Sequence, residues 1–295
     1  MSADAATETF VAHRNLLFTV AYEMLGSAAD AEDVLQETWL RWVRVELEHV
    51  RDPRAYLVRI TTRQSLNRLR TLKQRREAYV GPWLPEPLIT APDVAEDVEL
   101  AESVSMAMML VLERLAPTER AVFVLREVFG VEYDEIAEAV GRTPAAVRQI
   151  LHRARRHVEA HRPRRAVSAR ETRAAVEAFR RALETRDPQG LLDVLAPDVV
   201  LVNDGGGVKR AGLYPVVGAD RLVRYYLGGT ARHGAAITFE MTTANGFPAL
   251  ELRLDGELDG VIALRVEDGR IAGVYHVRNP AKLTRAGTET PLTLR

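Results

Sequence analysis

The sequence has 295 residues, of which 47% are hydrophobic and 27% charged, and its formal net charge is −1. It contains no cysteine, which excludes disulfides, thiol chemistry and cysteine-based metal sites. No apolar run approaches the roughly 20 residues that span a bilayer, and the N-terminus lacks the pattern of a signal peptide. These features predict a soluble, cytoplasmic protein of two or three domains.

Charged residues are strongly clustered in spite of the near-neutral total. Residues 51–76 hold nine Arg or Lys against one acid, and residues 142–165 hold eight Arg against one acid. Between them, residues 93–102 hold five acids and no base. Two basic modules therefore flank an acidic linker.

The first 76 residues carry helical periodicity. Apolar residues recur at three- and four-residue steps from Phe10 to Gly26 and again along residues 28–42. A third helix is expected to start with Asp52 as its N-cap and Pro53 at its first position. Its polar face carries cations, amides and hydroxyls, which suit an unstacked nucleic-acid strand but also an ordinary basic amphipathic helix.

The stretch that follows is expected to be an extended linker. Four prolines, at positions 82, 85, 87 and 92, rule out a helix there. Helices are expected to resume from roughly Val94 to Leu115. The linker thus separates two helical modules.

Residues 132–157 have the pattern of a helix-turn-helix. One helix ends at Gly141, and a second starts with Thr143 as N-cap and Pro144 at its first position. The outward face of the second helix is rich in Arg and includes Gln149 and His152. Arg pairs with guanine or phosphate and Gln with adenine, so the pattern favours DNA binding over a helical hairpin with a solvated basic face.

After about residue 165 the pattern changes to an α+β domain. Helices are expected near 169–185 and 188–195, followed by alternating strands in an antiparallel meander. Hairpin turns are predicted at Asn245-Gly246, Asp255-Gly256, Asp259-Gly260 and Asp268-Gly269. The fold class is therefore multidomain, with two all-α modules before an α+β domain.

The helical part resembles a known family of transcription factors. "DAEDVLQETWLRW" is similar to region 2.2 of bacterial extracytoplasmic-function (ECF) RNA polymerase sigma factors, and "DPRAYLVRITTRQSLNRLR" to regions 2.3 and 2.4. "LERLAPTERAVFVLREVFGVEYDEIAEAVGRTPAAVRQILHRARRHV" resembles region 4. The resemblance implies binding of the core RNA polymerase, through the β′ clamp helices and the β flap, and recognition of the −10 and −35 promoter elements. The loop of residues 45–53 would receive a flipped −10 base.

The resemblance, together with the polar helix faces, assigns three sets of site residues. Trp39 also fits a plain role in the hydrophobic core. The polymerase-binding set is Asp33, Gln36, Glu37, Trp39 and Trp42, the −10 set is Arg59, Arg63, Asn67 and Arg68, and the −35 set is Arg148, Gln149, His152, Arg153 and Arg156.

Residues 168–284 resemble the SnoaL-like group of the NTF2-like fold, a cone of curved sheet and helices. The SigJ-like sigma factors that carry such a domain have three motifs, WLPEP, DGGGK and NPDKL. This chain has the first intact, one residue inserted before the lysine of the second, and Ala281 in place of Asp in the third. The predicted regulatory set is Trp83, Pro85, Glu86, Asp204, Gly205, Gly206, Gly207, Asn279, Pro280 and Lys282.

Three interpretations of the glycine loop remain open. Asp204, His233 and His276 could supply an acid–base pair for an enzyme in the cone. Glycine amides with Lys209 could bind an anion, or the cone a small ligand. The glycines could instead allow close backbone approach of another segment, such as the Pro-rich linker, with Asp204 accepting hydrogen bonds and Trp83 as an anchor. We favour the third interpretation, in which the extra domain regulates the sigma modules in cis.

The expected domains are residues 7–76, 101–162 and 168–284, with a linker over 77–100 and a tail over 285–295. Polymerase and promoter DNA are the expected partners, with a small cone ligand as a further alternative. No enzyme activity, catalytic residue, metal or cofactor is predicted. A monomer is expected when the protein is free, because sigma binds polymerase one to one.

Overall fold

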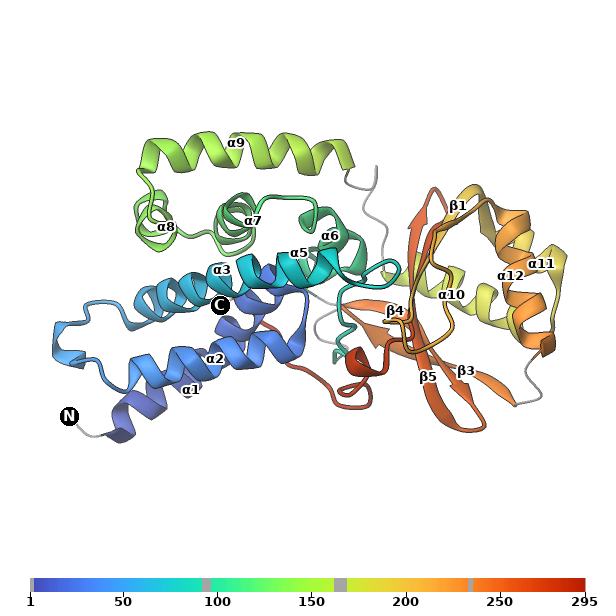
Figure 1. The fold of residues 1–295 in the computed structure, drawn as a ribbon, viewed down its shortest axis with the longest axis horizontal. Coiled ribbons are helices and arrows are strands. Elements are labelled where there is room, and N and C mark those ends of the chain that lie inside the picture. Colours follow the sequence, from blue (N-terminus) through green and yellow to red (C-terminus); the bar gives the residue numbers. More distant parts are fainter. Residues whose placement is uncertain (1–2, 92–96, 162–168, 233–235, 295) are drawn as a thin grey trace. The chain divides into compact units, whose positions relative to one another are not determined.

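The computed structural model describes residues 3–91, 97–161, 169–232 and 236–294 (Figure 1). The chain divides into two compact units, and neither is continuous in sequence. Unit 1 combines residues 1–77, 108–162 and 291–295, whereas unit 2 combines residues 78–107 and 163–290. The segment that joins the two helical modules of unit 1 is therefore part of unit 2.

The first module of unit 1 consists of three helices. Helices α1 (Ala3–Leu25), α2 (Ala28–Trp42) and α3 (Pro53–Glu77) pack against one another, with the short helix η1 (Leu47–His49) between the last two. The predicted cap of α3 is confirmed, since the Asp52 carboxylate accepts a hydrogen bond from the Ala55 amide at 3.0 Å. The apolar stripes read from the sequence form the buried core of this bundle.

The second module of unit 1 carries the helix-turn-helix. It contains α7 (Pro117–Phe123), the π-helical turn η2 (Val124–Val128), α8 (Tyr133–Val140) and α9 (Pro144–His161). Gly141 ends α8 with a φ of 67°, and the Thr143 hydroxyl accepts from the Ala146 amide at 3.2 Å. The predicted break and N-cap are thus both confirmed.

The two modules pack directly against each other within unit 1. Helix α3 contacts α7 and α8, and α1 contacts η2. Arg120 of α7 is 2% exposed, donates to the Glu23 carbonyl of α1 at 2.8 Å and pairs with Glu113. Residues 291–294 join the same unit, where the Thr293 amide donates to Thr19 at 3.1 Å. The chain end predicted as a tail is therefore partly packed on α1.

Unit 2 is built on one six-stranded sheet of order β2-β1-β6-β5-β4-β3. Its strands are β1 (Leu195–Asp204), β2 (Val216–Val217), β3 (Ile237–Ala244), β4 (Phe247–Leu254), β5 (Glu257–Glu267) and β6 (Arg270–Val277). Strands β3 to β6 form the expected meander, but β1 joins β6 in parallel. Its helices and helical turn are α5 (Val98–Val104), α10 (Ala169–Glu184), α11 (Pro188–Val194), α12 (Ala219–Arg232) and η3 (Pro280–Lys282).

The two faces of this sheet have different coverings. The larger core lies between the sheet and the helices α10, α11 and α12, which lie on one side of the sheet in Figure 1. Phe179, Leu201 and Val274 belong to this core. A smaller cluster includes Val261 and Ala249 and packs against Ile89 of the linker. Because side chains alternate along a strand, each strand serves both faces.

One predicted turn is wrong, and the observed helix and unit bounds add detail to the expected ones. Asp255, Asp268 and Asn245 have positive φ at hairpin turns, as expected, but Asp259-Gly260 lies inside β5. The helical stretch expected from Val94 starts at Val98 and is broken before α6 (Met106–Leu112), which carries the chain from one unit into the other. Residues 101–107, expected in the helix-turn-helix module, belong to unit 2. The boundary expected near residue 165 lies outside the described residues.

Among the described helices, none combines the length and hydropathy needed to cross a membrane.

Candidate sigma surfaces and linker dock

Helix α2 presents most of the predicted polymerase-binding residues. Asp33, Gln36 and Glu37 are exposed, and Trp39 is half-buried with its ring 5.2 Å from that of Phe10. Trp42 corrects the prediction. It is 0% exposed, and its indole nitrogen donates to the Ala6 carbonyl at 2.8 Å. Trp42 therefore belongs to the core of the first module and not to an outer surface, because it faces α1 and α3.

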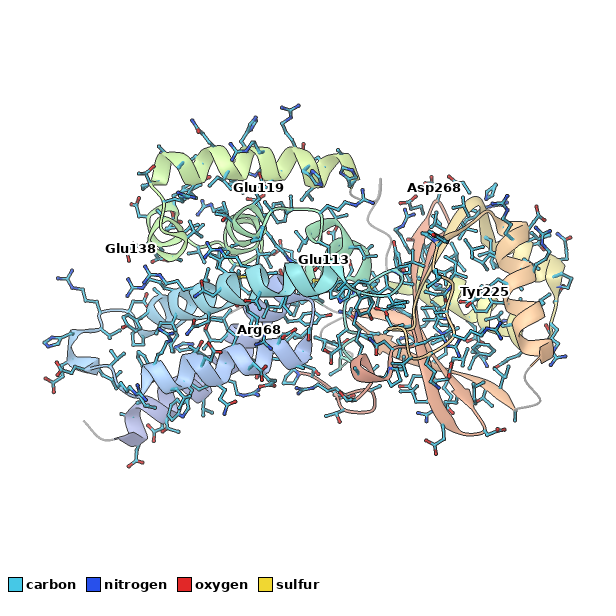
Figure 2. All side chains as sticks on the ribbon, in the orientation of Figure 1. Arg68, Glu113, Glu119, Glu138, Tyr225 and Asp268 are labelled. Carbon is cyan, nitrogen blue, oxygen red and sulfur yellow. The ribbon has the colours of Figure 1, made fainter. Side chains whose placement is uncertain are left out.

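Two cations of the predicted −10 set are held by the helix-turn-helix module. The Arg59 guanidinium lies 2.5 Å from the Glu138 carboxylate, and Arg63 donates to the Glu138 carbonyl at 2.7 Å. Arg59 also lies over the Tyr56 ring at 4.7 Å. Figure 2 labels Glu138, which α8 places against α3. Glu138 of the second module thus contacts two cations of the first module.

Arg68, a third member of the −10 set, is held by acids of α2. Its guanidinium lies 2.7 Å from Asp30 and 2.8 Å from Asp33, and Figure 2 labels Arg68. The pKa of Arg68 is raised by the Asp30 and Asp33 carboxylates in spite of partial burial, which acts in the opposite direction. Asn67, the preceding residue of α3, is exposed. A predicted −10 residue and a predicted polymerase-binding residue, Arg68 and Asp33, therefore pair with each other.

The predicted −35 residues are all exposed on α9. Arg148 lies over the Tyr133 ring at 5.3 Å, and Arg153 is 3.5 Å from Glu119. Apolar residues at helical spacing, including Val147 and Leu151, bury the opposite side of α9. The predicted residues on this outward side are Arg148, Gln149, His152, Arg153 and Arg156, and Arg155 is exposed as well.

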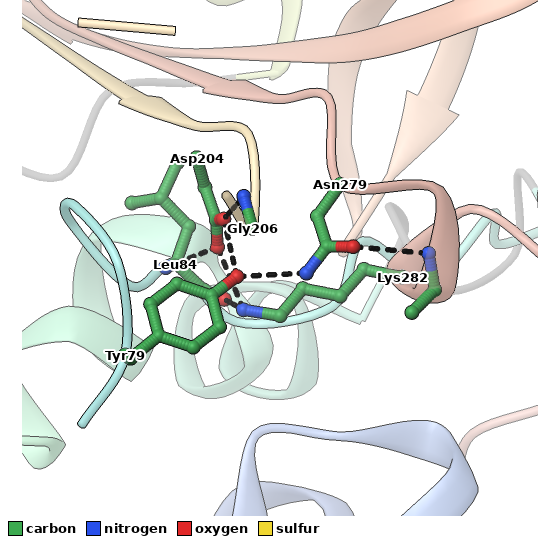
Figure 3. Close-up of polar contacts among 7 residues, drawn as sticks. Tyr79, Leu84, Asp204, Gly206, Asn279 and Lys282 are labelled. Atoms are coloured by element: carbon green, nitrogen blue, oxygen red, sulfur yellow. Dashed lines mark hydrogen bonds and ion pairs between the residues drawn. The ribbon is translucent and has the colours of Figure 1, made fainter. Parts of the chain in front are cut away.

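In unit 2 the Pro-rich linker is fixed on the C-terminal domain by the carboxylate of Asp204. Asp204 is 0% exposed at the end of β1. Its two oxygens accept from the Tyr79 hydroxyl at 2.5 Å, the Leu84 amide at 2.9 Å and the Gly206 amide at 3.0 Å (Figure 3). A buried carboxylate needs such donors, and here two of the three come from the linker.

Lys282 and Asn279 complete this contact from the segment after β6. The Lys282 ammonium lies 2.7 Å from Asp204, donates to the Leu84 carbonyl at 2.5 Å and stands 4.1 Å from the Trp83 ring. The Asn279 amide donates to the Tyr79 hydroxyl at 2.7 Å. Burial and the bond to Asp204 raise the pKa of the Tyr79 phenol, so that it remains a donor.

A second set of contacts holds the next part of the linker at the β3–β4 turn. Asn245 donates its backbone amide to the Leu88 carbonyl at 2.8 Å, and its side chain accepts from the Leu88 amide at 3.1 Å. The Gly246 amide donates to the Thr90 hydroxyl at 3.1 Å, and the Thr90 amide to the Thr243 carbonyl at 3.0 Å. We call residues 79–90 and their two sets of contacts the linker dock.

The glycines of the loop serve close packing. A side-chain carbon at Gly205 would lie 2.3 Å from the Lys209 carbonyl, and one at Gly206 would lie 2.4 Å from the Asn279 side chain. Gly206 and Gly207 have positive φ, of 61° and 73°. The Gly206 amide donates to Asp204, and the amides of residues 208 and 209 donate to Gly205. These amides point within the loop, which disfavours the anion-binding interpretation.

The structure brings most of the predicted regulatory set to the linker dock. Asp204, Gly206, Asn279 and Lys282 make the contacts described, Pro85 and Glu86 are buried and Trp83 is half-buried, whereas Gly207 and Pro280 are exposed. Sequence reasoning missed Tyr79, Leu84, Leu88 and Asn245, which provide most of the linker-side and turn-side contacts. The apolar spacing of Leu84 and Leu88, buried to 0% and 1%, was the signal available.

The residues offered for an enzyme are not brought together. In the β1–β6 pairing His276 lies beside Asn203, so Asp204 points to the opposite face of the sheet. His233 lies outside the described residues. Burial lowers the pKa of His276 to about 3, with a smaller contribution from Arg278, while Asp259 acts in the other direction. The imidazole is therefore neutral near pH 7.

This burial predicts a specific acid sensitivity. The unfolded His276 takes up a proton below about pH 6.5, but the folded side chain does not do so until about pH 3, so acid favours unfolding in that interval. We expect the melting temperature to fall more between pH 7 and pH 4.5 in the wild type than in His276→Gln. Equal losses in the two proteins would contradict the prediction, since all other titrating groups, including Arg278 and Asp259, are shared.

Comparison with known proteins decides the family. The description "Sigma-70 region 2" matches residues 9–76, and "Sigma-70, region 4" matches residues 105–158. The ECF RNA polymerase sigma factor SigJ of Mycobacterium tuberculosis is 36% identical over 289 residues, which cover 93% of this chain and 92% of the relative. The chain belongs to the ECF RNA polymerase sigma factors.

Further comparisons extend the likeness to the whole sigma factor. The probable ECF sigma factor SigI of M. tuberculosis is 33% identical over 287 residues, covering 95% of each chain. The crystal structure of M. tuberculosis SigJ superimposes with a TM-score of 0.76 at 33% identity, covering 94% of this chain and 98% of that one. The protein is thus an alternative sigma factor for transcription initiation, with an α+β domain fused after region 4. As a member of this family it binds core RNA polymerase and promoter DNA.

Proposed function

We propose that this sigma factor is regulated in cis, and that its free form keeps the −10 helix occupied until polymerase binds. The observation that carries the proposal is that three arginines on α3 already have partners within the protein. Arg59 and Arg63 contact Glu138, and Arg68 contacts Asp30 and Asp33. Cations that are already paired are poor ligands for phosphates, because DNA must displace a carboxylate first.

The exposed face of α2 fits the role of polymerase contact. Asp33, Gln36 and Glu37 project from one side of the helix, with half-buried Trp39 one turn further on. We assign this face to the β′ clamp helices and region 4 to the β flap. A clamp contact at Asp33 would compete with Arg68, 2.8 Å away, and thereby remove one of the two carboxylates that hold this −10 residue. Polymerase binding and exposure of the −10 surface would then be coupled.

The linker dock supplies the regulation. The segment of about 30 residues that joins the two sigma modules is part of unit 2. Released and extended, such a segment reaches roughly 100 Å, but while docked it cannot extend. Docking therefore keeps the effective concentration of one helical module near the other high, which favours the contact between the two modules. Undocking would let them separate toward the −10 and −35 elements.

The proposal predicts that Glu138→Gln increases initiation. The substitution removes the charge that pairs with Arg59 and retains the size of the side chain. Glu138 is 63% exposed, so the pair is worth at most about 1 kcal/mol, which corresponds to up to about a fivefold shift toward the open form. Abortive transcription with purified polymerase at subsaturating sigma factor measures the effect.

Glu135→Gln is the matched control, because Glu135 is an exposed acid on the same helix. It should leave initiation unchanged. Equal or lower initiation with Glu138→Gln than with the wild type would contradict the proposed occupation of α3.

A further inference from the structure

Three polar side chains lie together on the helix-covered face of the sheet in unit 2. Asn203 of β1 and His276 of β6 are paired residues of parallel strands, so their side chains project to the same side. The ring of Tyr226, from α12, lies 6.3 Å from the His276 ring at an interplanar angle of 21°. We call Asn203, Tyr226 and His276 the polar triad.

The polar triad is buried without hydrogen-bond partners. Asn203, His276 and Tyr226 are 1%, 3% and 5% exposed. Within the described part of the chain, five of their side-chain atoms have no hydrogen-bond partner. These atoms are both amide atoms of Asn203, both ring nitrogens of His276 and the hydroxyl of Tyr226. Buried polar groups are nearly always paired, and an unpaired one is destabilising. Three together indicate a role other than stability.

The backbone around the triad leaves room for it. A side-chain carbon at Gly260 would lie 2.7 Å from His276 Nε2, so only glycine fits beneath the imidazole. Neighbouring positions on the same face are apolar, among them Leu201, Ile262 and Val274. An apolar wall with a few convergent polar groups is the usual composition of a small-molecule site.

The chemistry of the triad selects an uncharged ligand. An amide, a phenol and a neutral imidazole offer several hydrogen-bond donors and acceptors but no charge. The nearby ions are already paired, since Asp259 lies 2.9 Å from Lys209 and 2.7 Å from Arg278. A charged ligand would therefore lose its hydration without gaining a partner of opposite charge.

We propose that the polar triad binds a small uncharged molecule with a carbonyl or hydroxyl group on an apolar body, and that this ligand strengthens the linker dock. The second half of this inference rests on the proposed function. Asn203 directly precedes Asp204, and the Arg278 amide, two residues after His276, donates to the Asp204 carbonyl at 2.7 Å. A ligand that orders the ends of β1 and β6 thus also orders residues that hold the linker, which gives positive cooperativity.

Thermal unfolding of the full chain tests the site without any ligand. Tyr226→Phe and Asn203→Leu remove unpaired groups at nearly constant size, so each should leave the melting temperature unchanged or raise it by about 2 °C or more. Asn279→Leu is the matched control, because both amide atoms of Asn279 are bonded, and it should lower the melting temperature by several degrees. A comparable loss in Tyr226→Phe and Asn203→Leu would mean that the triad is structural and would overturn the proposal.

A defined probe tests the ligand class. 4-Hydroxyacetophenone has a carbonyl and a hydroxyl on one ring, 4-ethyltoluene has the same shape without them, and 4-hydroxybenzoate adds a charge. Saturation-transfer NMR on the full chain should detect the first in preference to the other two. Asn203→Leu and Tyr226→Phe should each weaken its binding by tenfold or more. No preference among the probes, or no effect of the variants, would overturn the assigned chemistry.

Hydrogen exchange separates the ligand site from its coupling. The Leu84 amide is bonded to Asp204 and the Leu88 amide to Asn245, so both report on the linker dock. Bound 4-hydroxyacetophenone should slow exchange at both amides in the wild type but not in Asn203→Leu. Binding without slower exchange would refute the coupling alone. Slower exchange with no change in transcription would instead refute the proposed cis regulation.

Discussion

Asp204→Asn is expected to undock the linker and to raise initiation by the sigma factor at least fivefold. The carboxylate is fully buried and accepts from Tyr79, Leu84 and Gly206 while it pairs with Lys282. The asparagine side chain has the same shape, but an NH2 group replaces one carboxylate oxygen. This donor then faces other hydrogen-bond donors. The Lys282 ammonium, with a side chain only 11% exposed, then remains buried without its counter-charge.

The energetic cost of this substitution can be bounded. Removing one partner of a buried ion pair typically costs about 3–5 kcal/mol, far more than a surface pair is worth. Undocking relieves the cost, because the Tyr79–Leu84 segment and the Lys282 ammonium both gain access to water. We therefore expect faster hydrogen exchange at the Leu84 amide and higher abortive transcription at subsaturating sigma factor.

Two controls make this result specific to the linker dock. Asp198→Asn changes an exposed acid on the same strand and should affect neither measurement. The double variant Asp204→Asn, Lys282→Met should be less destabilised than the sum of the single variants, since neither buried charge is left alone. Faster exchange with lower initiation would show that docking promotes initiation, which contradicts the proposed brake.

The predictable part of the fold was the part that local chemistry decides. The Asp52 and Thr143 caps and the Gly141 break were read correctly because each depends on backbone groups within a few residues. The turn at Asn245-Gly246 was also predicted, but its second role was not. Asn245 binds Leu88, more than 150 residues away in sequence, and no local pattern contains that information.

Two errors have the same physical origin. Asp259-Gly260 has the composition of a hairpin turn, yet Asp259 is there to pair with Lys209 and Arg278, and Gly260 to make room for His276. Trp42 stands at a position where the family resemblance implies a polymerase contact, yet its indole lies inside the bundle and donates to the Ala6 carbonyl. In both cases tertiary partners from distant segments decided the role of a residue type that is ambiguous in one dimension.

Trp39 and Trp42 should consequently respond to substitution in opposite ways. Trp42 is fully buried, donates to the Ala6 carbonyl and has its ring 5.8 Å from Tyr56, so Trp42→Ala leaves a large cavity and an unpaired carbonyl. A loss of about 3–5 kcal/mol in stability is expected, large against the 5–15 kcal/mol typical of a whole domain. Trp39→Ala removes a half-buried ring packed on Phe10 and should lower the melting temperature far less.

Affinity for polymerase should show the reverse order once folding is accounted for. Exposed aromatic residues at a contact often supply 2 kcal/mol or more, so Trp39→Ala should weaken binding of the polymerase core enzyme by roughly thirtyfold. Val11→Ala, at a 62% exposed apolar residue on α1, is the control and should change neither quantity. Fluorescence anisotropy of labelled sigma factor with polymerase measures affinity, and circular dichroism measures folding. Strong unfolding by Trp39→Ala with unchanged affinity of the folded fraction would place Trp39 in the core beside Trp42, and the clamp contact would then have to rest on Asp33, Gln36 and Glu37 alone.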